Sequence, residues 1–295
     1  MSSPMRFGWV LNLDAELELS LPPHSYSAPT RLTRQLALYG AGARNLLGEQ
    51  DVLIAADTLV GGAGAGLVGR AWCPTPRALS LLRKAGVEPE PHPAAAVLRR
   101  VNHRLFALQL GGGLTGQRYV SERSELLALP LSEERPWLLK RPLSFSGRGQ
   151  LRIYASIDAK QWAWIDASLR SDGVIVEPLV QPTLELSLHG FVWRDGAFEL
   201  GRVCVQEVSD RGVFRGIRCA SPAELHAGES ALLVAAAVRV AEALWAAGYF
   251  GPFGIDGYRY RSREGGGFCA LGEINARYSM GFVTGFPRHP SELVL

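Results

Sequence analysis

The apolar and polar positions in the first third of the chain follow two different periods. Residues 7–11 and 51–56 are short apolar runs, and residues 30–39 carry apolar side chains at helical spacing. Short apolar runs are typical of buried strands, so these stretches predict a strand, a helix and a second strand. That order predicts a parallel sheet. Glycines crowd residues 61–69 and predict a loop, and residues 77–85 predict another helix.

The pattern changes after the proline-rich stretch at residues 87–93, which favours a domain boundary there. Residues 94–110 have helical periodicity, and short strand-like segments follow them. We expect a small antiparallel lobe with helices over residues 94–182. Its predicted elements are strands at residues 118–120, 137–140, 151–154 and 174–177 and a helix at residues 158–169.

The last third predicts long strands and one strong helix. Asp195-Gly196 is a turn signal between two strand-like segments and predicts a hairpin. An alanine-rich segment predicts a helix that ends at Gly248. The predicted strands are residues 184–193, 197–208, 253–261 and 268–274, and the predicted helix is residues 230–247.

Composition agrees with a folded chain of several lobes. The 295 residues are 47% hydrophobic, which is enough to bury one large core or several smaller ones. We expect an N-terminal α/β domain at residues 1–93, a small lobe at residues 94–182 and a C-terminal lobe at residues 183–295.

Charge and cysteine content exclude several classes of protein. The net charge at pH 7 is only +3 and the basic residues are spread along the chain, so nucleic acid is not expected as a partner. Charged residues interrupt residues 1–20, unlike a signal peptide or a membrane span, and we expect a cytoplasmic protein with no membrane partner. The cysteines contain no Cys-x-x-Cys pair, so reduced and mostly buried thiols are expected at Cys73, Cys204, Cys219 and Cys269.

Two segments suggest a nucleotide site. Lys140 ends a predicted strand and is followed by the small-residue loop at residues 144–149, Ser-Phe-Ser-Gly-Arg-Gly. A lysine offers a point charge to phosphate, and glycines let backbone N–H groups close over a polyphosphate. Residues 174–180 form a buried strand that exits into an extended edge suited to an adenine ring, and Glu185 could accept ribose hydroxyls. Alone, each segment is equally compatible with an ordinary glycine turn or a core strand.

The most specific polar residues lie on two neighbouring strands near the end of the chain. Asp256 lies on the first strand, and Glu273, Asn275 and Arg277 follow at a spacing of two on the next. In an extended chain this spacing places the three side chains on one face. Burying them without partners would be costly. Hard oxygen ligands of this kind suit Mg²⁺.

Taken in order, these segments resemble the ATP-grasp superfamily of carboxylate–amine and carboxylate–thiol ligases. The resemblance covers about residues 100 to 285, and residues 1–93 resemble the domain that precedes the ATP-grasp fold in such enzymes. It implies a mixed α/β and α+β architecture with ATP held between two sheets.

The resemblance also implies roles for single residues. Lys140 binds phosphate, and the loop residues Ser146, Gly147 and Gly149 close over the phosphates. Arg104 is the nearest match to a second basic residue that usually begins the central lobe. The adenine edge and the ribose would be contacted by Glu177, Pro178, Leu179, Val180 and Glu185.

The implied chemistry is phosphoryl transfer from ATP to a carboxylate. Asp256, Glu273 and Asn275 would bind Mg²⁺, with Mn²⁺ as a substitute. Arg277 would face the transferred phosphoryl group or the acyl intermediate, and Arg277 and Lys140 would be the catalytic residues. The acyl phosphate would then be attacked by an amine or another nucleophile. The implied partners are a small-molecule or peptide carboxylate and an amine-type acceptor, and the oligomeric state stays open, a homodimer included.

Two other readings of the chain compete with this interpretation. Residues 64–69, Gly-Ala-Gly-Leu-Val-Gly, match a dinucleotide-binding motif with Glu88 at a suitable distance, which would make the chain an NAD-dependent oxidoreductase. A nucleotide-binding sensor without catalysis is the third reading. Four arginines near the predicted hairpin could hold a substrate carboxylate or form a solvated basic edge: Arg202, Arg211, Arg215 and Arg218.

Overall fold

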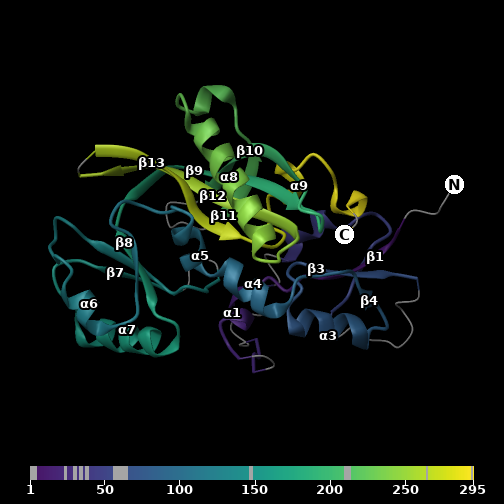
Figure 1. Ribbon diagram of the computed structural model, residues 1–295, viewed down its shortest axis with the longest axis horizontal. Helices are drawn as coiled ribbons and strands as arrows, with labels where there is room; N and C mark the ends of the chain where they lie inside the picture. The colour runs from purple at the N-terminus through teal and green to yellow at the C-terminus, as the bar shows by residue number, and fades with distance from the viewer. Residues whose placement is uncertain are drawn as a thin grey trace.

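Three β-sheets organise the chain (Figure 1). The computed structural model describes residues 5–22, 25–28, 32, 36, 40–55, 66–145, 149–208, 214–263, 265–293 and 295. Figure 1 shows the sheet of the first ninety residues at the right and a four-stranded sheet at the left. The largest sheet, crossed by a long helix, lies above and between them.

The first sheet is parallel, as the strand–helix–strand order predicted. Its strand order is β2-β1-β3-β4, with β1 (Phe7–Val10) paired to both β2 (Val52–Leu53) and β3 (Val68–Ala71). Asp51 supports this pairing because its carboxylate accepts hydrogen bonds from Phe7 N and Trp9 Nε1, both at 2.9 Å.

Two expectations for this region need correction at particular residues. Of the loop expected at residues 61–69, Val68 and Gly69 belong to β3, and residues 61–65 lie outside the described residues. The stretch at residues 87–93, where a linker between domains was expected, contains β4 (Glu88–Pro89), which pairs with β3. Glycine made the first stretch look irregular, yet Gly69 is needed for close approach, since a Cβ there would lie 3.0 Å from Glu88 O and Pro89 Cα. The predicted helix at residues 30–39 lies almost wholly outside the described residues.

Helix α3 (Pro76–Lys84) packs on this sheet, and two further helices connect it to the four-stranded sheet. Helix α3 begins at Thr75, whose side chain accepts a hydrogen bond from Ala78 N. The predicted helix at residues 94–110 is two helices, because His103 has extended backbone angles and its side chain caps the second by accepting from Leu105 N. These two are α4 (Ala95–Asn102) and α5 (Arg104–Gln109), and the short helices of the chain are α1 (Ala15–Leu19), α6 (Arg123–Leu127), α9 (Phe282–Gly285), η1 (Arg44–Leu46), η2 (Pro222–Glu224) and η3 (Pro290–Glu292).

The four-stranded sheet is antiparallel, as predicted, and has a core of its own. Its order is β5-β8-β6-β7, and helix α7 (Ala159–Ser171), started by a capping box of Asp158 and Gln161, covers it. Val120, Leu139, Ile165 and Val176 lie in this core. Its strands are β5 (Arg118–Val120), β6 (Trp137–Lys140), β7 (Gln150–Ile153) and β8 (Val174–Pro178).

The five-stranded sheet is antiparallel with the order β11-β10-β9-β12-β13. The predicted hairpin turn is present: Trp193 N–H donates to Ala197 O at 2.8 Å, and Gly196 has a φ of 92°. Helix α8 (Glu229–Ala246) packs on the sheet through Leu233 and Val240. The strands are β9 (Gln181–Val192), β10 (Phe198–Val208), β11 (Phe214–Cys219), β12 (Gly251–Ser262) and β13 (Gly265–Asn275).

The parallel sheet and the five-stranded sheet share one hydrophobic core. Trp9 of β1, Phe253 of β12 and Phe282 of α9 are fully buried in the same cluster, whereas the four-stranded sheet contributes to a separate one. The division into domains at residues 93 and 182 stays a prediction. Within the described part of the chain, no helix combines the length and the apolar character needed to cross a membrane.

Candidate functional site

A cleft of about 1990 Å³ lies between the four-stranded sheet and the five-stranded sheet. The segment that joins β8 to β9 runs along it, so one continuous stretch of chain borders both sheets. The predicted site residues that line the cleft are Lys140, Glu177, Pro178, Leu179, Val180, Glu185, Asp256 and Glu273.

Lys140 and Glu177 form an ion pair on the wall made by the four-stranded sheet. β6 and β8 are antiparallel neighbours, and Lys140 Nζ lies 2.5 Å from Glu177 Oε1. The Glu177 side chain is only 5% exposed while that of Lys140 is 18% exposed, so the ammonium group is the more accessible partner. The Glu177 carboxylate therefore holds the Lys140 ammonium group at the surface of the cleft, where that group can contact an anion.

Glu185 lies on β9, on the opposite wall. Partial burial raises the pKa of the Glu185 carboxyl above its usual value, while the charge of Lys140 acts in the other direction. Its neighbours across the ladder are Gln206 of β10 and Tyr258 of β12, and both also line the cleft. A polar strip therefore crosses three adjacent strands.

Asp256 and Glu273 bring two carboxylates together. They are directly opposite in the pairing of β12 with β13, so their side chains lie on one face of the sheet. Removal from water and then the charge of Glu273 raise the pKa of Asp256 to about 7. Hydrogen bonds from Asn275 Nδ2 at 2.8 Å and Gln206 Nε2 at 2.6 Å oppose this rise without cancelling it.

Arg277 does not share a strand face with Glu273 and Asn275, which corrects the expectation from the spacing of two. Strand β13 ends at Asn275, and the backbone turns there because Arg277 N–H donates to Asn275 O at 2.9 Å. The Arg277 guanidinium pairs with Glu16 and also donates to Asn275 Oδ1 at 2.9 Å. Its role toward a phosphoryl group stays a prediction.

Arg104 connects the two walls of the cleft. Its guanidinium donates to Glu273 Oε1 at 2.8 Å, to Arg141 O at 2.7 Å and to Ser144 Oγ at 2.8 Å. The split between α4 and α5 places Arg104 at the start of α5, where its side chain is buried between these partners. It thus ties the loop that follows Lys140 to a carboxylate of the opposite sheet.

The glycine loop after β6 is described only at its ends. Gly149 has a φ of 73°, and a Cβ there would lie 3.1 Å from Ser144 Cβ, so the turn requires a glycine. Arg141 N–H donates to Gly149 O at 2.8 Å and closes the turn. Ser146 and Gly147 lie outside the described residues.

The carboxylates fit a divalent cation. Mg²⁺ usually takes one or two protein carboxylates and completes its shell with phosphate oxygens and waters. Burial and then the charge of Glu273 raise the pKa of Asp256, and a cation would offset both by favouring the charged carboxylate. Asn275 presents its amide nitrogen to Asp256 here, so its side chain would have to rotate to become a ligand. Among the described residues, no three His, Cys, Asp or Glu side chains form a metal cluster by themselves.

Sequence reasoning missed Gln206. It orients Asp256 through a 2.6 Å hydrogen bond and lines the cleft, but no motif singles out a glutamine in the middle of a long strand. Only the pairing of β10 with β9 places it beside Glu185.

The other candidate groups lie away from the cleft. Arg218 pairs with Glu224 on the surface, and Arg211 lies outside the described residues. None of the predicted hairpin arginines that the structure describes is among the residues lining the cleft. Of the dinucleotide motif, Gly69 lies within strand β3 rather than in a turn before a helix, which removes the structural basis for that alternative.

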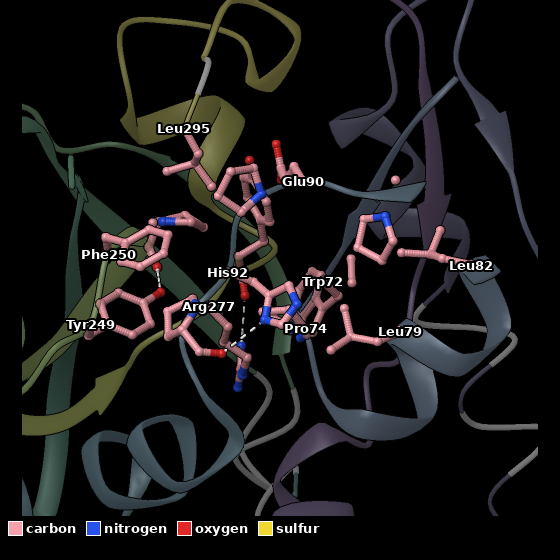
Figure 2. A pocket seen from close by; sticks show the side chains of 18 residues that line it. Trp72, Pro74, Leu79, Leu82, Glu90, His92, Tyr249, Phe250, Arg277 and Leu295 are labelled. Carbon is pink, nitrogen blue, oxygen red and sulfur yellow. Dashed lines mark hydrogen bonds between the residues drawn. The ribbon is translucent and has the colours of Figure 1, made fainter. Parts of the chain in front are cut away.

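A second, much smaller pocket lies where residues 69–93 meet residues 249–252 and 277–278 (Figure 2). Its volume is about 30 Å³, far smaller than that of the cleft. Figure 2 shows Trp72, His92, Tyr249 and Arg277 around it. The backbone N–H of Tyr278 donates to Trp72 O at 3.1 Å and fastens the two regions together.

Comparison with known proteins identifies the fold. No protein-family model matches the sequence, and no curated protein matches it as a sequence relative. The chain is similar to the solved structure of D-alanyl-alanine synthetase A from Vibrio cholerae, with 13% identity and a TM-score of 0.59, covering 99% of this chain and 94% of that one.

Two further solved structures are similar. One is carboxyaminoimidazole ribonucleotide synthase from Aspergillus clavatus in complex with ATP, with 14% identity, a TM-score of 0.54 and coverage of 99% and 78%. The other is N5-carboxyaminoimidazole ribonucleotide synthetase from Thermus thermophilus, with 18% identity, a TM-score of 0.50 and coverage of 92% and 72%. Such identities establish the fold alone. The chain therefore has the ATP-grasp fold that its motifs predicted.

Proposed function

We propose that this protein is an ATP-dependent ligase that activates a carboxylate and joins it to an amine or another nucleophile. The observation that supports this most is the composition of the two cleft walls. One wall offers the Lys140 ammonium group, and the other offers the paired carboxylates Asp256 and Glu273. A magnesium-bound triphosphate needs both kinds of group at once.

Different residues of the chain would contact the phosphates, the adenine and the ribose of ATP. Lys140 and the loop that ends at Gly149 would hold phosphate oxygens, and residues 177–180 would border the adenine. Glu185 would accept the ribose hydroxyls. Arg104, by contacting both Glu273 and the loop after Lys140, would fix the spacing of the walls. Bound ATP would supply the phosphoryl group, and its magnesium ion would neutralise charge between the walls.

Phosphoryl transfer of this kind depends on positioning and on charge neutralisation. Asp256 and Glu273 would hold the metal ion in place while Gln206 orients Asp256. Arg277 would need to exchange its contact with Glu16 for one with the reacting group, and we propose this exchange as its role. A cytoplasmic location and a small-molecule or peptide carboxylate as the acid complete the proposal.

The test combines binding with turnover. Calorimetric titration with a non-hydrolysable ATP analogue should show binding that depends on Mg²⁺. Phosphate release should then appear with one pairing from a panel of acids and amines. Binding without turnover across the panel would favour a nucleotide sensor, and failure to bind the analogue would overturn the proposal. A titration with NADH, followed by nicotinamide fluorescence, should show no binding.

A further inference from the structure

Two of the four cysteines face each other across neighbouring strands. Cys204 of β10 is directly opposite Cys219 of β11 in the strand register. Cys269 of β13 instead faces Tyr258, and Cys73 follows β3 outside the strands. All four are free thiols in this structure. The chain therefore contains one cross-strand pair and two isolated cysteines.

The pair occupies a position of the ladder that suits a disulfide. Ala220 N–H donates to Val203 O at 2.9 Å, one step along the ladder from the cysteines. Hydrogen-bonded and non-hydrogen-bonded pairs alternate between antiparallel strands, so Cys204 and Cys219 form a non-hydrogen-bonded pair. The Cα atoms of such pairs lie about 4.5 Å apart. A disulfide spans roughly 4.4–6.8 Å between Cα atoms, so the usual backbone spacing of such a pair lies within the range that a disulfide can bridge.

The two thiols differ in their surroundings. Cys204 is fully buried, and burial together with the adjacent Cys219 thiol raises the pKa of Cys204 to about 12. Cys219 is half-buried on the edge strand, and its thiol donates to Thr284 O at 3.5 Å. Cys219 is therefore the more accessible of the two residues to an oxidant, and Cys204 lies directly opposite it, in position to react with an oxidised Cys219.

We propose that Cys204 and Cys219 are a site of reversible oxidation, at which a peroxide converts the two thiols to a disulfide. In the first step the Cys219 sulfur attacks the peroxide and becomes a sulfenic acid, and the peroxide is reduced to water or an alcohol. In the second step the Cys204 sulfur displaces the sulfenic hydroxyl as water and the S–S bond forms. The two thiols supply both electrons, and an added dithiol returns them.

The bond would fasten an edge strand beside the cleft. β11 is the edge strand next to β10, and Gln206 lies two residues beyond Cys204 on the same face of β10. Gln206 donates the 2.6 Å hydrogen bond to Asp256, so the crosslink would stiffen the part of the sheet that carries the candidate carboxylates. The inference uses only the ladder and the thiols, so it stands apart from the proposed ligase activity.

The test uses the full chain treated with hydrogen peroxide, then unfolded and alkylated with N-ethylmaleimide. Two cysteines should escape alkylation, and peptide mapping should find residues 204 and 219 in one crosslinked species that dithiothreitol separates. Hydrogen exchange of the β11 amides should slow roughly tenfold or more in the oxidised protein, because the edge strand can no longer separate from β10.

Matched variants decide the outcome. Cys219→Ser and Cys204→Ser should each abolish the crosslink, whereas Cys73→Ser and Cys269→Ser should retain it. Cys219 is half-buried, so its serine variant preserves the test if the buried Cys204 variant does not fold. Oxidation of Cys219 to a sulfinic or sulfonic acid with Cys204 still open to alkylation would overturn the proposal. A disulfide between two copies of the chain would overturn it as well.

Discussion

The cleft and the junction between the parallel and five-stranded sheets use the same residue types in opposite ways. At the junction, Arg70 is 1% exposed and forms two hydrogen bonds with Glu90, while it also donates to the carbonyl oxygens of Pro290 and Leu293. At the cleft, Lys140 pairs with Glu177, and its side chain lines the cleft and stays partly exposed. A charged side chain that is buried and hydrogen-bonded within the protein stabilises the fold. A charged side chain that is partly exposed and has hydrogen-bonding groups to spare can bind a ligand.

The carboxylates of the junction and those of the cleft also differ in their partners. Glu16 at the junction pairs with the Arg277 guanidinium. Asp256 and Glu273 at the cleft face each other, and the pKa of Asp256 rises to about 7. The first arrangement pairs two opposite charges. In the second, Arg104 pairs with Glu273, and a bound cation would offset the remaining negative charge of the two neighbouring carboxylates. Four variants, taken from the largest expected effect to the smallest, test this difference.

Arg70→Met should cost the most stability. It leaves Glu90 and two buried carbonyl groups without their donor, and breaking a buried ion pair of this kind costs about 3–5 kcal/mol of unfolding free energy. Denaturant unfolding measures the loss. The matched control is Arg218→Met, since Arg218 is 47% exposed and pairs with Glu224 at the surface, so no measurable change is expected. Equal unfolding free energies for Arg70→Met and Arg218→Met would contradict a structural role for the buried arginine.

If the proposed ligase activity is correct, Glu273→Ala should reduce turnover by about 10²-fold or more, because it would remove a ligand of the magnesium ion that balances charge in the transition state. Steady-state phosphate release measures the effect, once the substrate pair is identified. Glu199→Ala is the control, since that glutamate pairs with Arg288 outside the cleft. Near-normal turnover in Glu273→Ala would refute the metal role of this strand.

His189 should make the protein less stable in mild acid. Burial lowers the pKa of His189 to about 4, against about 6.5 for an unfolded histidine. Between these values the unfolded chain takes up a proton that the folded chain excludes, so stability falls as pH drops from 6.5 to 4, by about 3 kcal/mol in all.

The measurement compares unfolding free energies of the wild type and His189→Gln across that pH range. Asp256 acts in the opposite direction, because its raised pKa makes the folded state bind a proton more readily. The difference between the two proteins isolates the histidine. His226→Gln is the matched control for replacing a histidine, since the His226 side chain is 71% exposed. Parallel profiles for wild type and His189→Gln would contradict the assignment.

Lys140→Met should weaken binding of an ATP analogue about tenfold, or about 1.4 kcal/mol. A charge-assisted hydrogen bond to phosphate is worth somewhat more, but the lysine also gives up part of its contact with Glu177 when it binds. Calorimetry with and without Mg²⁺ measures the change. Lys160→Met on helix α7 is the control, and an equal loss in both variants would count against a specific phosphate contact.

Local chemistry accounts for what could be predicted of the fold. The strands Arg118–Val120 and Trp137–Lys140 and the turn at Asp195-Gly196 lie where the apolar runs and the turn residues indicated. The errors occur where a distant partner overrides the local signal. Strand β4 exists because β3 offers it a parallel edge, and His103 divides one predicted helix into two because its side chain caps the second.

The candidate site shows the same limit. Spacing along β13 placed Glu273 and Asn275 correctly on one strand, because strand geometry is local. The spacing did not predict the position of Arg277 correctly, because the chain turns there. Its guanidinium pairs with Glu16, which lies more than 250 residues earlier in the sequence. The part played by Gln206 is also invisible to local patterns, since it depends on the register between β10 and β9.

The sequence by itself determined the kinds of groups and their order: a cation after a strand, an extended edge, then carboxylates on two late strands. Only the tertiary structure decided which of these groups share a cleft and which form ion pairs with other residues of the protein. The reason is physical, because local propensity follows from neighbouring residues, whereas burial, pairing register and pKa depend on what the rest of the chain brings within a few ångströms.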